Sequence, residues 1–183
     1  VLDLALPTPA SNINLARASL WRGYTFVFMA QDFCTGVVDG GPELTTANML
    51  DSAVVHFTNA ISIGTANATA EGVALANAAK VGRARAHLQA GRGPQASADA
   101  ASVPAGFSFT LPMVDNLAQR TRLGNRFWQY TSDRGSIGVS DVFRVRPDSR
   151  VPYKTPTEHN LAPQDASTGA FYIQNKYPAF NTP

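Results

Sequence analysis

An alanine-rich segment, residues 68–103, constrains the fold of this chain more than any other. It reads ATAEGVALANAAKVGRARAHLQAGRGPQASADAASV, and Val73, Ala76 and Ala79 follow one another at the three-residue spacing of a helix face. The tetrapeptide GRGP at 91–94 interrupts the run. Glycine suits the left-handed position that ends a helix, and proline suits the first turn of the next one. The segment therefore predicts two helices joined by a tight turn, whose small side chains let the backbones approach closely.

A long helix is predicted ahead of this segment, from Ser11 to about Phe33. Ser11 is a suitable N-cap, and apolar residues follow it at helical spacing. The many large side chains predict a helix buried on most sides, with Trp21 in the core. Cys34 follows in an apolar context, which favours a buried, inert thiol, and a single cysteine cannot form an internal disulfide. The sequence DGGP then predicts a turn within a loop over residues 35–43.

The next predicted helix covers residues 47–63 and is capped by Thr45 or Thr46. It contains the pattern A-x-x-x-F-x-x-A around Phe57. In the second helix of a tetratricopeptide unit this pattern seats small residues against the partner helix and lets phenylalanine fill the gap. The chain is therefore predicted to contain a scaffold of tetratricopeptide-like helical hairpins over residues 12–103. The two hairpins span residues 12–63 and 68–103.

The character of the chain changes after Pro104, where glycine, proline, serine and asparagine become frequent. Residues 104–183 are predicted to form a loop-rich region packed on the scaffold, within a single domain over residues 1–183. Its aromatic residues are too apolar for a disordered tail. The expected fold class is mostly α, with about four helices in the hairpins and a Pro-rich C-terminal half. The latter is expected to contain a short strand or extended segment at 107–110, a helical turn at 114–120, and short strands near 139–145 and 170–174.

Composition and motifs argue against several classes of function. No basic run is longer than two residues, so nucleic-acid binding has no support. No apolar run approaches the roughly 18 residues of a membrane span. His56, His87 and His159 are isolated from one another, so no metal site and no cofactor are expected. The chain lacks the motifs of serine hydrolases, P-loop enzymes and dinucleotide-binding enzymes, and no pair of carboxylates stands out, so a non-catalytic protein is expected.

The sequence does contain the parts of a glycan-binding site. Sugar rings stack their CH faces on flat aromatic side chains, and their hydroxyls bond to planar donors and acceptors such as arginine, aspartate and asparagine. Trp128 is the best candidate, because it lies in the loop-rich region. The alternative is that Phe127 and Trp128 only pack the loops onto the helices. The candidate ligand-binding residues are Arg126, Trp128, Tyr130, Asp133, Arg134, Tyr153 and Tyr172.

A possible glycosylation site lies at Asn67, because Asn67-Ala-Thr69 is a formal sequon. Thr69 stands at the expected start of a helix, so the alternative is that it serves as a helix cap. Charged residues make up only 15% of the chain, below the roughly 25% typical of globular proteins. The surface must therefore be polar through uncharged side chains, which is common in secreted and cell-surface proteins.

The order of motifs resembles the SusD/RagB family. An ARASLWRGYTFVFMAQDFC helix precedes DGGPELT and the segment AVVHFTNAI, and AKVGRARAHLQAG and ADAASVPAGFSFT follow. The phrases DSRVPY at 148–153 and QNKYP at 174–178 resemble the region that follows the helical scaffold in that family. The resemblance covers roughly residues 16–178. The chain lacks a lipobox cysteine near Val1 and the final helices of the family, so it is expected to be a partial or shortened member.

The resemblance implies a function and a location. SusD-like proteins capture glycans or peptides at the cell surface and deliver them to a TonB-dependent transporter. The implied location is the extracellular face of the outer membrane, or secretion, and the implied partners are a glycan or oligopeptide and that transporter. The alternative is a structural protein whose helical-repeat units self-associate into an extracellular layer or filament.

Overall fold

The computed structural model describes residues 8–116, 118–146, 148–159 and 172–179. In it the chain forms two compact units, residues 1–109 and 110–183, divided close to the predicted change of character. Helices predominate over strands, so the mostly α fold class is confirmed. The tetratricopeptide-like character of the hairpins and the single domain stay predictions.

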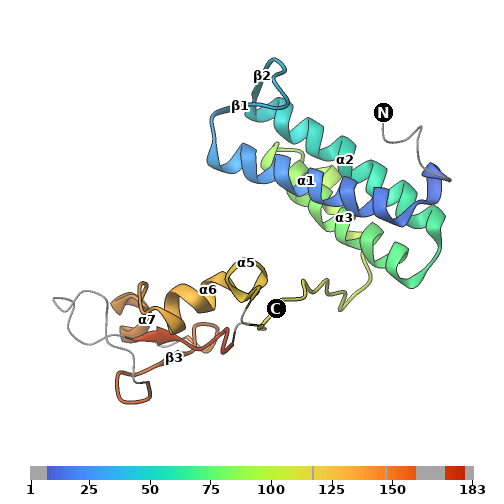
Figure 1. Ribbon diagram of the computed structural model, residues 1–183. Coiled ribbons are helices and arrows are strands. Elements are labelled where there is room, and N and C mark those ends of the chain that lie inside the picture. The colour runs from blue at the N-terminus through green and yellow to red at the C-terminus, as the bar shows by residue number, and fades with distance from the viewer. Residues whose placement is uncertain (1–7, 117, 147, 160–171, 180–183) are drawn as a thin grey trace. The chain divides into compact units, whose positions relative to one another are not determined.

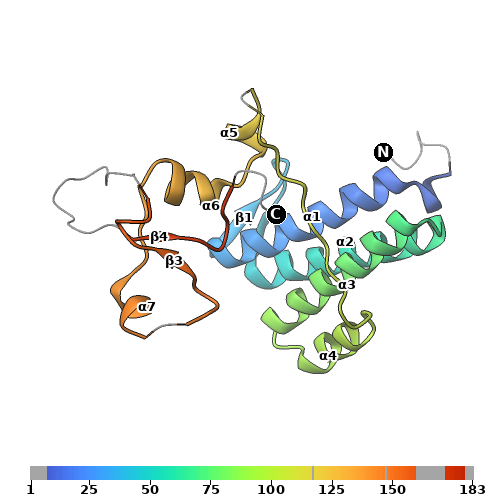
Figure 2. The same ribbon diagram turned by 90° about the horizontal axis from the view of Figure 1, so that it is seen from below.

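The N-terminal unit is a small helical bundle. A 3-10 turn, η2, leads into four α-helices in the described part of this unit. Figure 1 shows α1, α2 and α3 side by side, with α2 packed against both of the others. Figure 2 shows α4 next to α3, which it contacts. The elements are η2 (Pro9–Ser11), α1 (Ile13–Asp32), α2 (Thr46–Asn67), α3 (Ala70–Gln89) and α4 (Gly93–Ala101).

The helix ends follow the sequence signals closely. Thr45 is the predicted cap of α2, and it forms a reciprocal capping box with Asn48, in which each side chain bonds the other residue's backbone N–H. Gly91 adopts a left-handed conformation, φ +71°, between α3 and α4, as predicted. The cap of α1 is Asn12 and not Ser11, because Ser11 is part of the η2 turn. The Asn12 side-chain oxygen accepts from two first-turn N–H groups, at 3.0 and 3.3 Å.

The core of the bundle is built around Phe57 on α2. Its side chain is 0% exposed, as are Ala53 and Ala60 of the predicted pattern. The ring lies between Gly23 on α1 and Gly82 on α3. A Cβ atom at Gly23 would come within 2.7 Å of the ring, and one at Gly82 within 2.4 Å. Positions 23 and 82 therefore need glycine, because the Phe57 ring fills the space that a side chain at either position would occupy.

The contact between α2 and α3 is also made by glycine. A Cβ atom on Gly72 would lie 2.5 Å from the carbonyl oxygen of Gly64, so the two backbones touch. This decides which face of α3 is buried. Leu75 and Ala76 are buried, whereas Val73 is 50% exposed, so the prediction that Val73 belongs to the packed stripe is wrong. Gly72 and Ala76 lie next to Gly64 because only small side chains permit this close approach.

Two predictions for α1 and the residues that follow it are also wrong. Trp21 is 42% exposed instead of lying in the core, and Cys34 is exposed instead of buried. The packing of α1 explains both. Its buried positions, which include Leu20, Gly23 and Val27, form one stripe toward the other helices, and Trp21 lies off that stripe. Cys34 comes after the helix has ended, next to a β-hairpin.

That hairpin replaces the predicted loop over residues 35–43. Strands β1 (Thr35–Val37) and β2 (Glu43–Thr45) pair antiparallel between α1 and α2. The predicted turn is present: Asp39 and Gly40 both have positive φ, +53° and +69°, and the N–H of Gly41 donates to the carbonyl of Val38. Two consecutive residues with positive φ suit the twist of a hairpin. The Asp-Gly turn therefore lets the flanking residues pair as strands.

An ion pair joins three helices of this unit. The Arg83 guanidinium on α3 donates to both carboxylate oxygens of Asp99 on α4, at 2.8 and 2.6 Å, and to the Thr58 hydroxyl on α2, at 3.0 Å. His87 lies one turn along α3, with its ring nitrogen 4.0 Å from Asp99. Burial lowers the pKa of His87 below its usual 6.5, Asp99 opposes that shift, and the positive charge of Arg92 adds to it.

We expect the stability of the protein to fall when His87 is protonated. Because the folded-state pKa is lowered, the unfolded chain takes up the proton first as the pH falls through about 6.5, and the free energy of unfolding decreases. Burial also lowers the pKa of His56, which acts in the same direction. Urea unfolding at about pH 8 and about pH 5 measures the loss. A His87→Gln variant should lose less stability over this range; an unchanged loss in that variant would contradict the prediction.

The C-terminal unit consists of short elements. Strand β3 pairs antiparallel with β4, with Tyr153 opposite Gln174 and Lys154 opposite Ile173. The predicted strand at 170–174 is therefore found at its last two residues, and residues 170–171 lie outside the described part. The elements are α5 (Arg120–Leu123), α6 (Arg126–Trp128), the π-helical turn η3 (Gln129–Asp133), α7 (Asp141–Val145), β3 (Tyr153–Lys154) and β4 (Ile173–Gln174).

Two local predictions for residues 104–183 are wrong. Residues 141–145 form helix α7 and not a strand, because Asp141 is favourable in a first helical turn and pairs with Arg144 three residues later. The helical turn expected at 114–120 is found at Arg120–Leu123. The segment 107–110, expected as a short strand or an extended segment, belongs to neither of the two sheets in the described part of the chain.

Candidate functional site

An open cleft of about 780 Å³ lies in the C-terminal unit. Its volume falls in the range of roughly 300–1,000 Å³ that is usual for sites that bind small molecules. Segments from α6, η3, the chain before and within α7, the turn at 150–152, β4 and the chain after β4 contribute to it. Most of its lining is apolar, and the main apolar side chains are Met113, Phe127, Ile137, Val139, Phe143 and Val151.

Gln174 organises the floor of the cleft. It is only 7% exposed, and its side-chain nitrogen donates to the Thr131 hydroxyl and to the Tyr177 carbonyl, both at 3.0 Å. Its side-chain oxygen accepts from the Tyr177 N–H at 2.8 Å. The Thr131 hydroxyl in turn donates to the carbonyl of Phe127 at 2.7 Å. The buried polar groups of the floor therefore bond to each other, which holds the cleft in one shape.

Backbone bonds and aromatic contacts fix the walls. The Val139 N–H donates to the Tyr172 carbonyl at 2.7 Å, which ties the segment before α7 to the start of the β4 segment. The Asn175 N–H donates to the Pro152 carbonyl at 2.8 Å. The rings of Phe127 and Tyr177 meet edge to face, with centroids 5.6 Å apart. Segments that are distant in the sequence thus meet around the cleft.

The charged residues of the lining are all basic in the described part of the chain: Arg126, Arg150 and Lys176. Arg150 is engaged, because its guanidinium donates to both oxygens of Asp148. These bonds hold the pKa of Asp148 below its usual value. Arg126 donates to the neutral side chain of Gln129 at 2.6 Å. The ammonium of Lys176 lies 5.8 Å from the centre of the Tyr177 ring.

Of the candidate ligand-binding residues, all of which are described, only Arg126 lines the cleft. Trp128 is half-buried at the end of α6, where its backbone N–H donates to the capping Asn125 at 2.9 Å. Tyr130 and Arg134 are exposed and contact each other, with the guanidinium carbon 5.5 Å from the ring centre. Asp133 is exposed at the end of η3.

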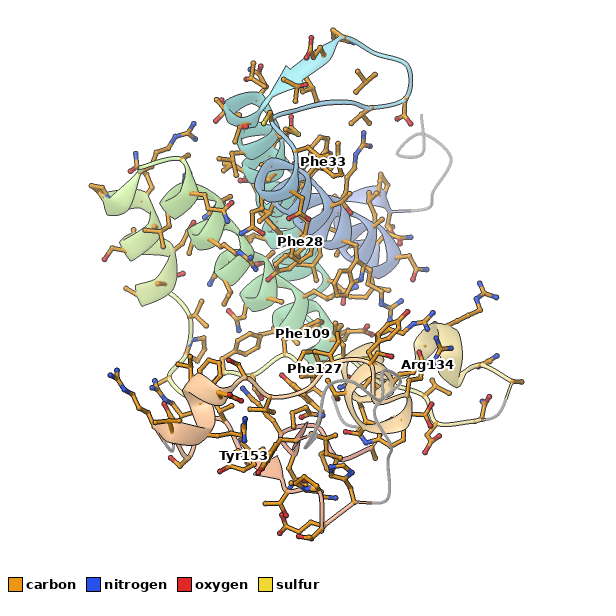
Figure 3. The ribbon with its side chains drawn as sticks, turned by 90° about the vertical axis from the view of Figure 1, so that its left-hand side faces the viewer. Phe28, Phe33, Phe109, Phe127, Arg134 and Tyr153 are labelled. Carbon is orange, nitrogen blue, oxygen red and sulfur yellow. The ribbon has the colours of Figure 1, made fainter. Side chains whose placement is uncertain are left out.

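The two other tyrosine candidates lie together away from the cleft lining. Tyr153 on β3 and Tyr172 meet edge to face at 5.8 Å. The guanidinium of Arg144 lies 4.0 Å from the centre of the Tyr172 ring. The structure thus brings Tyr153 and Tyr172 together, and separately Tyr130 and Arg134. Figure 3 labels Phe127, Arg134 and Tyr153 among the side chains of this unit.

The cleft also uses residues that sequence reasoning did not single out. Gln174, Lys176 and Tyr177 all belong to the phrase QNKYP, which stood out as part of the resemblance and not as part of a site. Phe143 was expected on a strand, and α7 brings it to the lining instead. The available signal was the concentration of polar and aromatic residues in one short phrase of a loop-rich region.

The sequon asparagine, Asn67, ends α2 and has both side-chain atoms engaged. Its nitrogen donates to the Ser11 carbonyl at 2.8 Å, and its oxygen accepts from the Thr69 hydroxyl. Thr69 caps α3 by accepting from the Gly72 N–H at 3.1 Å. The alternative role of Thr69 as a helix cap is thus observed. Glycosylation of Asn67 stays a prediction, and it would require the bond to Ser11 to break.

Comparison with family models, curated proteins and solved structures finds no match for this chain. The described residues contain no cluster of three or more histidine, cysteine, aspartate or glutamate side chains that could hold a metal ion. None of the helices in the same described ranges is sufficiently long and apolar to cross a membrane. The geometry of the cleft is therefore the main basis for assigning a function.

Proposed function

We propose that this chain is a non-catalytic binding protein that captures a glycan or oligopeptide in the cleft of its C-terminal unit. The observation that carries the proposal is the cleft itself, with an apolar and aromatic lining over a floor of mutually bonded polar groups around Gln174. A concave, mostly apolar surface with a few placed polar groups is the usual form of a ligand site.

The ionisable groups near the cleft support binding over catalysis. A general acid or base works best with a pKa near the working pH. The hydrogen bonds that Asp148 accepts from Arg150 lower the pKa of Asp148, which moves it further from the neutral range. The polar side chains of the floor, Gln174 and Thr131, are engaged with each other and have no ionisable proton in the neutral range.

The cellular setting of the proposal comes from the resemblance to the SusD/RagB family. By that resemblance the protein stands at the extracellular face of the outer membrane, or is secreted, and passes its ligand to a TonB-dependent transporter. The helical unit would supply the rigid scaffold. Its glycine-mediated helix contacts at Phe57 and Gly72 suit such a role, because close backbone packing limits relative movement of the helices.

Isothermal titration of the full chain with neutral oligosaccharides and with short oligopeptides tests the proposal. A ligand of either class should bind, and Phe127→Ala should weaken its binding at least about tenfold, because the ring is part of the cleft wall. Phe33→Ala is the matched control: Phe33 is an exposed phenylalanine of the helical unit, so its loss should leave binding unchanged. Equal losses in the two variants, or no binding of either class, would contradict the proposal.

One observation favours the second candidate function, self-association. The helical unit exposes large apolar side chains, among them Trp21, Phe28 and Leu88, which are exposed by 42%, 48% and 67%. Figure 3 labels Phe28 on this unit. Exposed apolar patches often mark protein contacts. Light scattering on the same samples separates the candidates, because a monodisperse monomer would exclude a layer or filament built by these helices.

A further inference from the structure

We infer that the ligand of the cleft is an oligopeptide that carries a carboxylate beside an apolar side chain. The inference rests on the proposed function, because it specifies the ligand class of the same site. Two features of the cleft carry it. The first is that the polar side chains of the floor already bond within the protein. The second is that the charged side chains of the described lining are basic.

The polar groups of the floor are used within the protein. The side-chain nitrogen and oxygen of Gln174 both have partners, and the Thr131 hydroxyl donates to a backbone carbonyl. Sugar hydroxyls each need a donor and an acceptor, and carboxylates are the acceptors that proteins commonly offer them. The described lining contains no carboxylate. A neutral glycan would thus find no carboxylate acceptor in the described lining, and the hydroxyls that face Phe143, Ile137 and Val151 would lose hydrogen bonds, which costs free energy.

The cleft instead offers positive charge. Among the described residues, the ion pairs of the C-terminal unit are Arg144–Asp141 and Arg150–Asp148, and neither pair includes Arg126 or Lys176. A guanidinium has five N–H donors, and the bond to Gln129 uses one of those of Arg126, so the guanidinium can also donate to a ligand. A guanidinium and an ammonium together are the usual partners of a carboxylate.

The two cations flank an apolar surface. Arg126 adjoins Phe127 in the chain and Lys176 adjoins Tyr177, and the two rings contact each other at 5.6 Å. Both cations and both rings line the cleft. A ligand that fits must therefore combine an apolar group with an anion a few atoms away. An oligopeptide provides this combination at an apolar C-terminal residue, or where aspartate or glutamate follows an apolar residue.

Titration calorimetry of the full chain with three related probes tests the inference. The probes are an N-acetylated tetrapeptide of alanine and phenylalanine with a free C-terminal carboxylate, the same peptide amidated, and an amidated version ending in glutamate. The free acid or the glutamate peptide should bind at least about tenfold more tightly than the neutral amide, since a charged hydrogen bond is lost in the amide. The probe that gains affinity tells whether a main-chain or a side-chain carboxylate is bound.

Variants that remove one charge identify the groups responsible. Arg126→Met and Lys176→Met should each reduce the preference for the carboxylate several-fold while leaving the affinity for the neutral amide within about twofold. Arg22→Met, an exposed arginine of α1, is the matched control and should preserve the preference. Thermal unfolding of each variant checks that it folds, and a higher salt concentration should weaken the acid peptides selectively.

The outcomes separate this inference from the function on which it rests. Equal binding of acid and amide peptides would overturn the carboxylate inference while leaving a peptide-binding protein. Binding of neutral oligosaccharides or of oligogalacturonate, without any peptide, would overturn the peptide class while leaving a binding protein. Failure of every probe and every saccharide to bind would overturn both.

Discussion

Replacing Phe57 with alanine is expected to lower the free energy of unfolding by about 3–5 kcal/mol, as for other large-to-small changes of a buried aromatic residue. The ring is fully buried, and it contacts the edge of Tyr24 at a centroid distance of 5.0 Å. It also fills the space left by Gly23 and Gly82. Glycine has no side chain that could move into the vacated space, so the cavity would persist. Urea unfolding followed by circular dichroism measures the loss.

Phe28→Ala is the matched control for this prediction. It removes the same side chain from α1, where Phe28 is 48% exposed, and should cost much less. A second variant tests the geometry itself. Gly82→Ala alone should cost about 1–3 kcal/mol, because its Cβ would overlap the Phe57 ring. Combined with Phe57→Ala it should cost far less, so strictly additive losses would show that the ring does not occupy this position.

Removing the carboxylate of Asp99 is expected to have the second-largest effect. Asp99→Ala should cost about 2–3 kcal/mol, less than the 3–5 kcal/mol of a fully buried pair because water still reaches Arg83. The side chains of Arg83 and Asp99 are 23% and 11% exposed. The substitution leaves the guanidinium without its two charged bonds and removes this link between α3 and α4.

An ion pair at the surface of the same unit serves as the control. Arg92 pairs with Asp51, but both side chains are more exposed than those of the Arg83–Asp99 pair. Asp51→Ala should therefore cost no more than about 1 kcal/mol. Chemical unfolding of the two variants under the same buffer conditions compares them directly. Similar losses for Asp51→Ala and Asp99→Ala would mean that burial does not strengthen the Arg83–Asp99 pair.

The helices of the first hundred residues were predictable because their signals are local. Capping residues such as Thr45, the glycine at position 91 and the pattern around Phe57 act through neighbours within a few residues in the chain. The errors concern which face of a helix is buried. Trp21 and Val73 were expected in the core on the basis of size and spacing, but glycine contacts between helices decide the buried face.

The cleft was much less predictable than the scaffold. Of the residues chosen from the sequence, Arg126 lines it, whereas Trp128 and Tyr130 do not. These candidates were chosen for their residue types in the loop-rich region. The cleft is assembled instead from short segments that lack regular periodicity, and its central residue, Gln174, bonds to Thr131, 43 residues away. No spacing rule links residues at such a separation.

The sequence by itself determined the mostly α fold class, the positions of the long helices and the change of character after Pro104. These follow from backbone conformational preferences and from hydrophobic periodicity, which operate within one or two helical turns. Only the tertiary structure decided that Phe57 lies between two glycines and that Gln174, Phe127 and Lys176 share a cleft. Close packing and buried hydrogen bonds depend on which distant segments meet, and that is a property of the folded chain.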